Sequence, residues 1–298
     1  MRHILNLVAL SALLAAGPAL AQNRLGDPEA PRPIAARASL WTEELTSLEV
    51  RDAIRAGATT IIIGTGGVEH NGPYVATGKH NYVLQTVLPY MAREIGHALI
   101  APIVKFVPEG RIDPPDSHMA FAGAISLEEK TFEALLTDIC RSYKAHGFVD
   151  IILVGDSGRN QAGMEAVAAE LNRRWAGERA RVHYLREYYY EDQWSYAFLK
   201  SKGIVQVDKT PPPGEAPDRP ADVRNGIHDD IYHEAQIAVQ DPALIRMDER
   251  SKAGLFSLHG VQLTPLSRTV QLGRGLAEYR AKITAKAFLD SKKRLRPQ

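Results

Sequence analysis

Residues 61–81 read Ile-Ile-Ile-Gly-Thr-Gly-Gly-Val-Glu-His-Asn-Gly-Pro-Tyr-Val-Ala-Thr-Gly-Lys-His-Asn, so an apolar β-branched run passes directly into a glycine-rich loop. Such a run, bounded by glycines, is typical of a buried strand that ends in a loop. The loop carries four side chains that can bind a metal or move a proton: Glu69, His70, Asn71 and His80. Because ligands of open α/β sheets bind beyond the carboxyl ends of strands, we expect the chemistry of the chain here.

The rest of the chain alternates between strand and helix patterns. Apolar strand patterns occupy residues 58–63, 98–104, 149–154 and 181–185. Helical spacing occupies residues 42–57, 82–95, 126–147, 164–175 and 275–293, with a further helix after residues 226–234. This alternation predicts an α/β fold, a single three-layer domain whose mostly parallel sheet has helices on both faces.

The N-terminus has the three parts of a signal peptide. A basic start is followed by an apolar run and by the small-residue site Ala19-Leu20-Ala21. The run is interrupted by Gly17-Pro18 and is shorter than the ~20 apolar residues that span a bilayer. We therefore expect residues 1–21 to be a cleaved signal peptide, residues 22–38 a flexible lead-in and residues 39–298 the α/β domain. The protein would be exported, to the periplasm if the source is Gram-negative.

Charge and cysteine content exclude several classes of partner. Cleavage removes one basic residue, Arg2, and no acidic one, which leaves 35 residues of each sign. A surface without net charge gives no support for binding nucleic acid, or a membrane after signal cleavage. Cys140 is the one cysteine of the chain, so no intramolecular disulfide can form, and its place in a helical apolar pattern predicts a core thiol.

Three polar clusters can carry chemistry: residues 69–80, 156–160 and 228–234. The first two follow predicted strands, and the third precedes a predicted helix. Carboxylates and imidazoles together suit Zn²⁺ or Mn²⁺, and a bound divalent ion makes hydroxide available near neutral pH. No single spacing is diagnostic, but the three clusters together favour a metal-assisted hydrolase.

Several motifs, in order over residues 39–250, resemble the creatininase (creatinine amidohydrolase) family. They are the Trp-Thr-Glu-Glu-Leu-Thr run from Trp41, residues 64–73, residues 118–127, His146-Gly147-Phe148 before residues 151–154, and His228 before Glu234. The resemblance implies a creatininase-like α/β fold and a two-metal site with a bridging water that attacks a C–N amide bond, typically of a cyclic amide or formamide. It also implies a compact homo-oligomer, a hexamer.

Carried over by position, the resemblance assigns roles to individual residues. Glu69 matches a metal ligand, and His228 matches an active-site histidine implicated in proton transfer. The other ligand positions are substituted. Asn71 stands for a histidine, His80 for the bridging aspartate, Ser157 for a histidine and Arg159 for a glutamate.

These substitutions favour one metal instead of two. A neutral imidazole nitrogen binds one ion, and Arg159 brings a fixed positive charge that disfavours a second cation (about 4 kcal/mol between unit charges 4 Å apart at an effective dielectric of 20). We therefore expect one Zn²⁺ or Mn²⁺ per chain on Glu69, His80 and Asp156, with water in the open position. An intact two-metal site and a site without catalytic metal remain alternatives.

The remaining polar residues receive roles around that ion. Arg159 would stabilise the oxyanion, His228 would act as general acid or base and Asn71 would assist. His118, Ser157 and Tyr74 are the candidate substrate-binding residues. The expected substrate is a small-molecule amide, whose identity the sequence does not specify.

Two other functions remain open. Gly155-Asp156-Ser157 after an apolar strand resembles the nucleophile block of the Gly-Asp-Ser esterases and lipases, with His233 as base and Asp230 orienting it. That block normally opens its domain, whereas here more than a hundred residues precede it. A non-catalytic small-molecule-binding protein on the creatininase-like scaffold is the second alternative.

Overall fold

The computed structural model describes residues 26–190, 194–205 and 230–295. The predicted signal peptide, residues 1–21, and His228 lie outside these ranges, so both stay predictions. Within the described ranges, no helix is both long enough and apolar enough to cross a membrane.

A four-stranded parallel sheet forms the centre of the molecule, in the order β2-β1-β3-β4. The strands are β1 (Thr60–Thr65), β2 (Ala98–Ile100), β3 (Asp150–Gly155) and β4 (Arg181–Tyr184). β1 and β3 are buried along their whole length, as their continuous aliphatic runs predict for strands covered on both faces. The predicted α/β class is confirmed. A short antiparallel ladder, β5 (Ser257–Leu258) with β6 (Val261–Gln262), lies outside this sheet.

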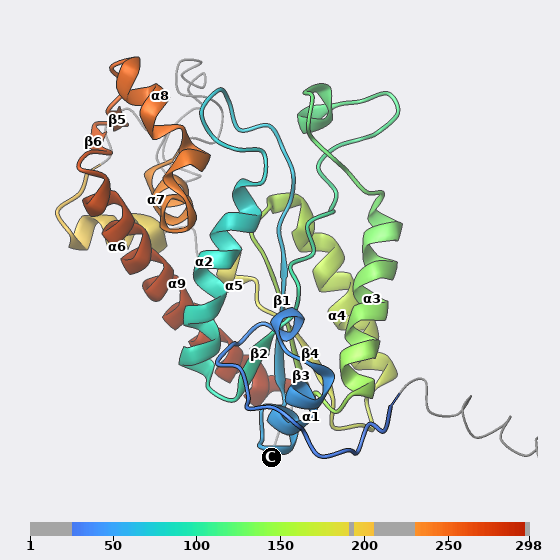
Figure 1. Ribbon diagram of the computed structural model, residues 1–298. Helices are drawn as coiled ribbons and strands as arrows, with labels where there is room; N and C mark the ends of the chain where they lie inside the picture. The colour runs from blue at the N-terminus through green and yellow to red at the C-terminus, as the bar shows by residue number, and fades with distance from the viewer. Residues whose placement is uncertain (1–25, 191–193, 206–229, 296–298) are drawn as a thin grey trace, which may run out of the picture.

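Helices cover both faces of the sheet. Ile62 faces one side, with α2 (Lys79–Ile95), α7 (Ile231–Gln240) and α9 (Leu266–Leu295). Ile61 and Ile63 face the other, with α1 (Ser47–Arg55), α3 (Glu129–Ala145) and α4 (Gln161–Arg174). Figure 1 shows α2 and α9 on one side of the strands and α3 and α4 on the other. The alternation of neighbouring isoleucines between two cores follows from the two-residue period of a strand.

The other described helices are short: η1 (Thr42–Glu44), η2 (Ser117–Ala120), η3 (Gly158–Asn160), α5 (Glu187–Tyr190), α6 (Trp194–Ser201), η4 (Pro242–Ile245) and α8 (Met247–Lys252).

Two predicted elements are divided or shortened in the structure, and the C-terminal helix, expected over residues 275–293, is longer and begins at Leu266. The helix expected over residues 42–57 is divided into η1 and α1, because Thr46, and not Thr42, caps α1 in a reciprocal capping box with Glu49. The strand expected over residues 98–104 ends at Ile100. Pro102 has no N–H for a strand ladder, and Val104 rejoins the sheet through an isolated bridge to Thr65.

One boundary bears on the site. The sequence predicts a helix from residue 82, but α2 begins at Lys79. Lys79 and His80 therefore lie in the first helical turn instead of a loop, and both side chains are buried. A helix holds side chains more firmly than a loop does, so the polar groups that follow β1 have a rigid support.

Candidate active site

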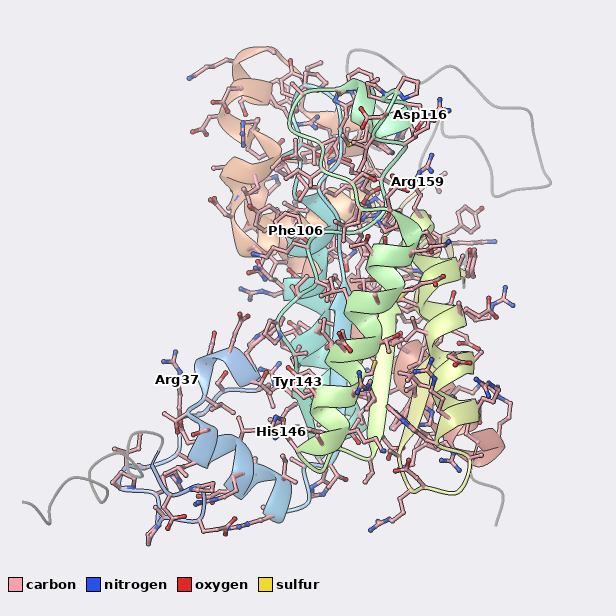
Figure 2. The ribbon with its side chains drawn as sticks, turned by 90° about the vertical axis from the view of Figure 1, so that its right-hand side faces the viewer. Arg37, Phe106, Asp116, Tyr143, His146 and Arg159 are labelled. Atoms are coloured by element: carbon pink, nitrogen blue, oxygen red, sulfur yellow. The ribbon has the colours of Figure 1, made fainter. Side chains whose placement is uncertain are left out.

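The polar cluster predicted from the sequence assembles at the carboxyl ends of β1 and β3. The last residues of these strands, Thr65 and Gly155, are paired neighbours, so the loops that follow them start side by side. The loop after β1 and the segment of residues 105–128 extend from this end of the sheet (Figure 1). Arg159 and Asp116 lie at the same end, away from His146 (Figure 2). We define the site cluster as Glu69, Lys79, His80, Glu109, His118, Asp156 and Arg280.

His80 stands between two carboxylates. Its Nε2 lies 2.9 Å from Glu69 Oε1, and its Nδ1 lies 2.8 Å from Asp156 Oδ2. Ionised carboxylates only accept hydrogen bonds, so this position between two carboxylates favours the doubly protonated imidazolium form of His80. Burial and the Lys79 ammonium lower the pKa of His80, but the two carboxylates raise it more, and the net pKa lies above its usual value.

Each of these carboxylates also has a buried cation of its own. Lys79 Nζ lies 3.0 Å from Glu69 Oε1, and Arg280 Nη1 from α9 lies 2.7 Å from Asp156 Oδ1. Tyr188 adds a hydroxyl 3.3 Å from the same Asp156 oxygen. Burial raises the pKa of Asp156. The contacts with Arg280 and His80 lower this pKa by more than burial raises it, so the carboxylate stays ionised at neutral pH.

Within the described residues, Glu109 contacts no such cation. It is fully buried, and its Oε2 accepts a hydrogen bond of 3.4 Å from Ser157 Oγ. Its Oε1 makes no hydrogen bond within the described part of the chain. A Cβ at Gly67 would lie 2.0 Å from Oε1, so this glycine leaves room for the carboxyl group. Burial, together with the Glu69 carboxylate, raises the pKa of Glu109 to about 8.

His118 approaches the other oxygen of Glu69. Its Nε2 lies 3.3 Å from Glu69 Oε2, and its side chain is 14% exposed, whereas that of Glu69 is 4% exposed. Burial lowers the pKa of His118 below its usual value, which favours the neutral ring, the form in which imidazole binds metals.

Two groups in the described residues can offer three ligands to one cation: His80 with Asp156 and His233, and Glu69 with Glu109 and His118. In each group the ligand atoms lie within 4.8 Å of one another. The ligand set expected from the sequence was Glu69, His80 and Asp156. The structure brings these three residues together, but Glu69 belongs to one of the two groups, whereas His80 and Asp156 belong to the other. The two nitrogens of one imidazole point apart, so a single ion cannot take Glu69 and Asp156 through His80.

The donor chemistry of the two groups differs. Arg280 already balances the charge of Asp156, so that site gains less from a further cation. Glu69, Glu109 and His118 provide two carboxylates and an imidazole, the usual ligands of Zn²⁺ and Mn²⁺, and Glu109 contributes a buried oxygen without a hydrogen bond. These residues fit a divalent ion.

The other predicted site residues lie in different settings. Asn71 is buried, and its Nδ2 donates to the backbone oxygens of Glu69 and Ala76. Arg159 is exposed on η3. Tyr74 lies under the guanidinium of Arg250, 4.8 Å from its ring centre. The roles predicted for Asn71, Arg159 and Tyr74 stay predictions.

No observation supports the esterase alternative. The Ser157 hydroxyl donates to Glu109, and Asp230 caps α7 by accepting from the backbone N–H of Tyr232 at 3.2 Å. The His233 ring lies edge-on to His80, with 6.1 Å between ring centres.

Comparison with known proteins identifies the family. A family model described as creatinine amidohydrolase matches residues 43–278, well over half of the chain. The chain belongs to the creatininase family. Membership indicates a metal-dependent amidohydrolase and confirms the resemblance found in the sequence.

Solved creatininase structures share the fold. A crystal structure of creatinine amidohydrolase is 18% identical over 88% of this chain and 100% of its own, with a TM-score of 0.55. A manganese form of creatininase is 19% identical over 87% and 100%, and a mutant of the Zn–Zn type is 18% identical over 88% and 100%, both with a TM-score of 0.54. No curated protein matches the chain.

Sequence reasoning missed three members of the site cluster. Lys79 directly precedes a predicted ligand, but nothing in its neighbourhood shows that it is buried. Glu109 stands in a loop between Pro108 and Gly110, where a carboxylate after an apolar strand is a weak signal. Arg280 lies in a helix with many charged residues, so nothing in the sequence distinguishes it from the exposed ones. Its partner Asp156 is 124 residues away in the chain.

Proposed function

We propose that this creatininase-family protein hydrolyses a small-molecule amide, at a C–N bond other than a peptide bond, with the help of one divalent cation bound in the site cluster. Family membership supports the amidohydrolase class. The position of the cluster at the carboxyl ends of two central strands supports its use as the active site.

The burial of the Glu109 carboxyl group is the observation that carries this proposal. A buried carboxyl group without a cationic partner opposes folding, and apolar residues of similar volume often stabilise such a position. Strongly perturbed acids concentrate at functional sites because their chemistry requires the perturbation. A scaffold kept only for its fold, or for binding a neutral ligand, would gain stability by losing this group.

The ion and the chain have separate tasks. When bound, a divalent cation polarises an amide carbonyl and makes a water molecule more acidic. Glu69, Glu109 and His118 would hold it. Lys79 and His80 orient the Glu69 carboxylate, and Arg280 orients Asp156 on the far side of His80.

Substrate would enter from the exposed side of the cluster. His118 is the partly exposed member of the proposed ligand set, and Arg159 is exposed on η3, at the same end of the sheet (Figure 2). Arg159 provides a charge that can stabilise the oxyanion of a tetrahedral intermediate. His228 retains the role of general acid or base that the family resemblance gives it. The burial of the other cluster members favours a small substrate over a polypeptide.

A substrate panel tests the proposal. The mature chain from Gln22, loaded with Zn²⁺ or Mn²⁺, would be incubated with creatinine, other cyclic amides, N-formyl compounds and linear amides, and release of the amine or ring-opened acid followed by mass spectrometry. We expect hydrolysis of at least one class, abolished by a chelator and restored by the metal. Glu69→Gln should lower kcat/KM by about 100-fold or more, the size typical of removing one catalytic group.

The matched control is Glu128→Gln, which removes an exposed glutamate outside the cluster and should leave kcat/KM unchanged. Absence of turnover with every class, or full activity of Glu69→Gln, would overturn the proposal.

A further inference from the structure

The geometry points to a relocated metal site. We propose that the divalent cation of this chain binds to Glu69, Glu109 and His118, with the carboxylate of Glu109 as a ligand in place of those the chain has lost. The inference rests on the proposed function for what the ion does, but its binding is argued from the cluster alone.

Apart from Glu69, the positions that the family resemblance gives to metal ligands hold groups that bind cations less well than the expected histidines and carboxylates do. Both ring nitrogens of His80 face carboxylates, Glu69 at 2.9 Å and Asp156 at 2.8 Å, so neither nitrogen is open to an ion. Arg159 is itself a cation. Asn71 has only a neutral amide oxygen to offer an ion, because its Nδ2 donates to two backbone oxygens.

Protein cations balance the charge at two of the three carboxylates. Arg280 contacts Asp156, and Lys79 contacts Oε1 of Glu69. Glu109 has neither a cation in contact nor a hydrogen bond to its Oε1 within the described residues, although the group is fully buried. An ion there would bind the one carboxyl group of the cluster that contacts no protein cation within the described residues.

The second oxygen of Glu69 faces the same place. Oε2 lies 3.3 Å from His118 Nε2, and two ligands of one tetrahedral ion with bonds of ~2.1 Å are about 3.4 Å apart. One atom from each of Glu69, Glu109 and His118 lies within 4.8 Å of the others, so small side-chain rotations close the set. Glu69 would then connect the Lys79 ammonium on one oxygen with the metal on the other.

The proposed ligand set also leaves the ion accessible to solvent and substrate. His118 is partly exposed, whereas Glu69 and Glu109 are buried, so the coordination position beside His118 is the one that faces solvent. Three protein ligands with an open fourth position are the pattern of catalytic zinc sites. Gly67 completes the arrangement, because any larger residue would press on Glu109 Oε1.

Direct binding of the metal tests this site without reference to activity. The mature chain, stripped with a chelator, would be titrated with Zn²⁺ and with Mn²⁺ by calorimetry, and the bound metal counted by mass spectrometry after desalting. We expect one ion per chain. Glu109→Gln and His118→Ala should each raise the Kd by about 100-fold or more, beyond the 10–100-fold typical of losing a group that only supports a ligand.

Two matched variants make the test specific. His233→Gln alters the other candidate group, and Glu128→Gln alters an exposed glutamate; both should bind the ion as tightly as the parent chain. Gly67→Ala should weaken binding without removing any ligand, which guards against misfolding of Glu109→Gln. Circular dichroism would confirm that each variant is folded.

The outcomes separate this site from the proposed function. An ion lost in His233→Gln but retained in Glu109→Gln, or a folded chain that binds no ion, would overturn the relocated site. Binding that depends on Glu109, without hydrolysis of any amide, would leave the site standing and reject the proposed function.

Discussion

At the scale of single residues, the site is a set of buried charges that balance one another. Arg280 and Asp156 are 3% and 1% exposed, and each neutralises the buried charge of the other. We expect Arg280→Met to lower the free energy of unfolding by about 3–5 kcal/mol, because it leaves Asp156 buried without its cation. Urea denaturation followed by circular dichroism measures the difference.

Arg173→Met is the control for that variant. Arg173 pairs with Glu170 on the exposed surface of α4, and such pairs contribute about 0–1 kcal/mol. Equal loss of stability in the two variants would show that burial of the Arg280 pair has no special effect.

Cys140 provides a residue-scale prediction outside the site. Burial raises the pKa of its thiol to about 12, so about one molecule in ten thousand carries the thiolate at pH 8. The native protein should therefore react slowly with a thiol reagent such as a chromogenic disulfide up to about pH 10, and one thiol per chain should react in denaturant. Rapid reaction of the native protein at pH 8 would mean that Cys140 is accessible.

The sequence predicted part of the site at this scale. Glu69, His80 and Asp156 stand directly after strand patterns or near them, and the structure brings them into contact. Their partners were not predictable, because no local pattern shows that Lys79 is buried or that Arg280 reaches Asp156. For the same reason Glu109 was not among the ligands predicted from the sequence, which were Glu69, His80 and Asp156.

At the scale of elements, close packing of α4 against β3 fixes the start of the second loop. A Cβ at Gly155 would lie 2.4 Å from Met164 Cε and 2.7 Å from Thr65 Oγ1, both in the buried interior. Gly155→Ala should cost about 1–3 kcal/mol by overpacking. Differential scanning calorimetry should show a lower Tm for this variant than for the parent chain.

Gly177→Ala is the matched control, because a Cβ at Gly177 would meet no atom within 4 Å. An unchanged Tm in both variants would show that the Gly155 contact can relax freely.

The elements themselves were largely predictable, since periodicity is a local property. β1 and β3 follow the apolar runs to within two residues. The ends were less predictable, because they depend on side-chain capping and on tertiary contacts. Thr46 takes the cap that was expected of Thr42, and α2 extends back to Lys79 because its first turn is held by the site cluster.

At the scale of the whole molecule, the strand–helix alternation predicted one sheet between two helical layers, and the structure confirms it. Export and assembly stay predictions. Expressed from residue 1 in a Gram-negative host, the protein should appear in the periplasm with Gln22 as its first residue, as intact mass would show. A full-length protein retained in the cytoplasm would contradict this expectation.

The assembly that the family resemblance implies can be measured on the same material. Light scattering of the mature chain should give the mass of a hexamer. A monomer across the micromolar range would show that this chain differs from the compact homo-oligomer expected of its family.

The central claim is that one cation binds to Glu69, Glu109 and His118. Anomalous X-ray scattering from crystals of the mature chain loaded with Zn²⁺ or Mn²⁺ tests it most directly. We predict one anomalous peak per chain within about 2.0–2.2 Å of an oxygen of Glu69, an oxygen of Glu109 and a nitrogen of His118. A peak between His80, Asp156 and His233 instead, or no peak from metal-loaded crystals, would contradict the claim.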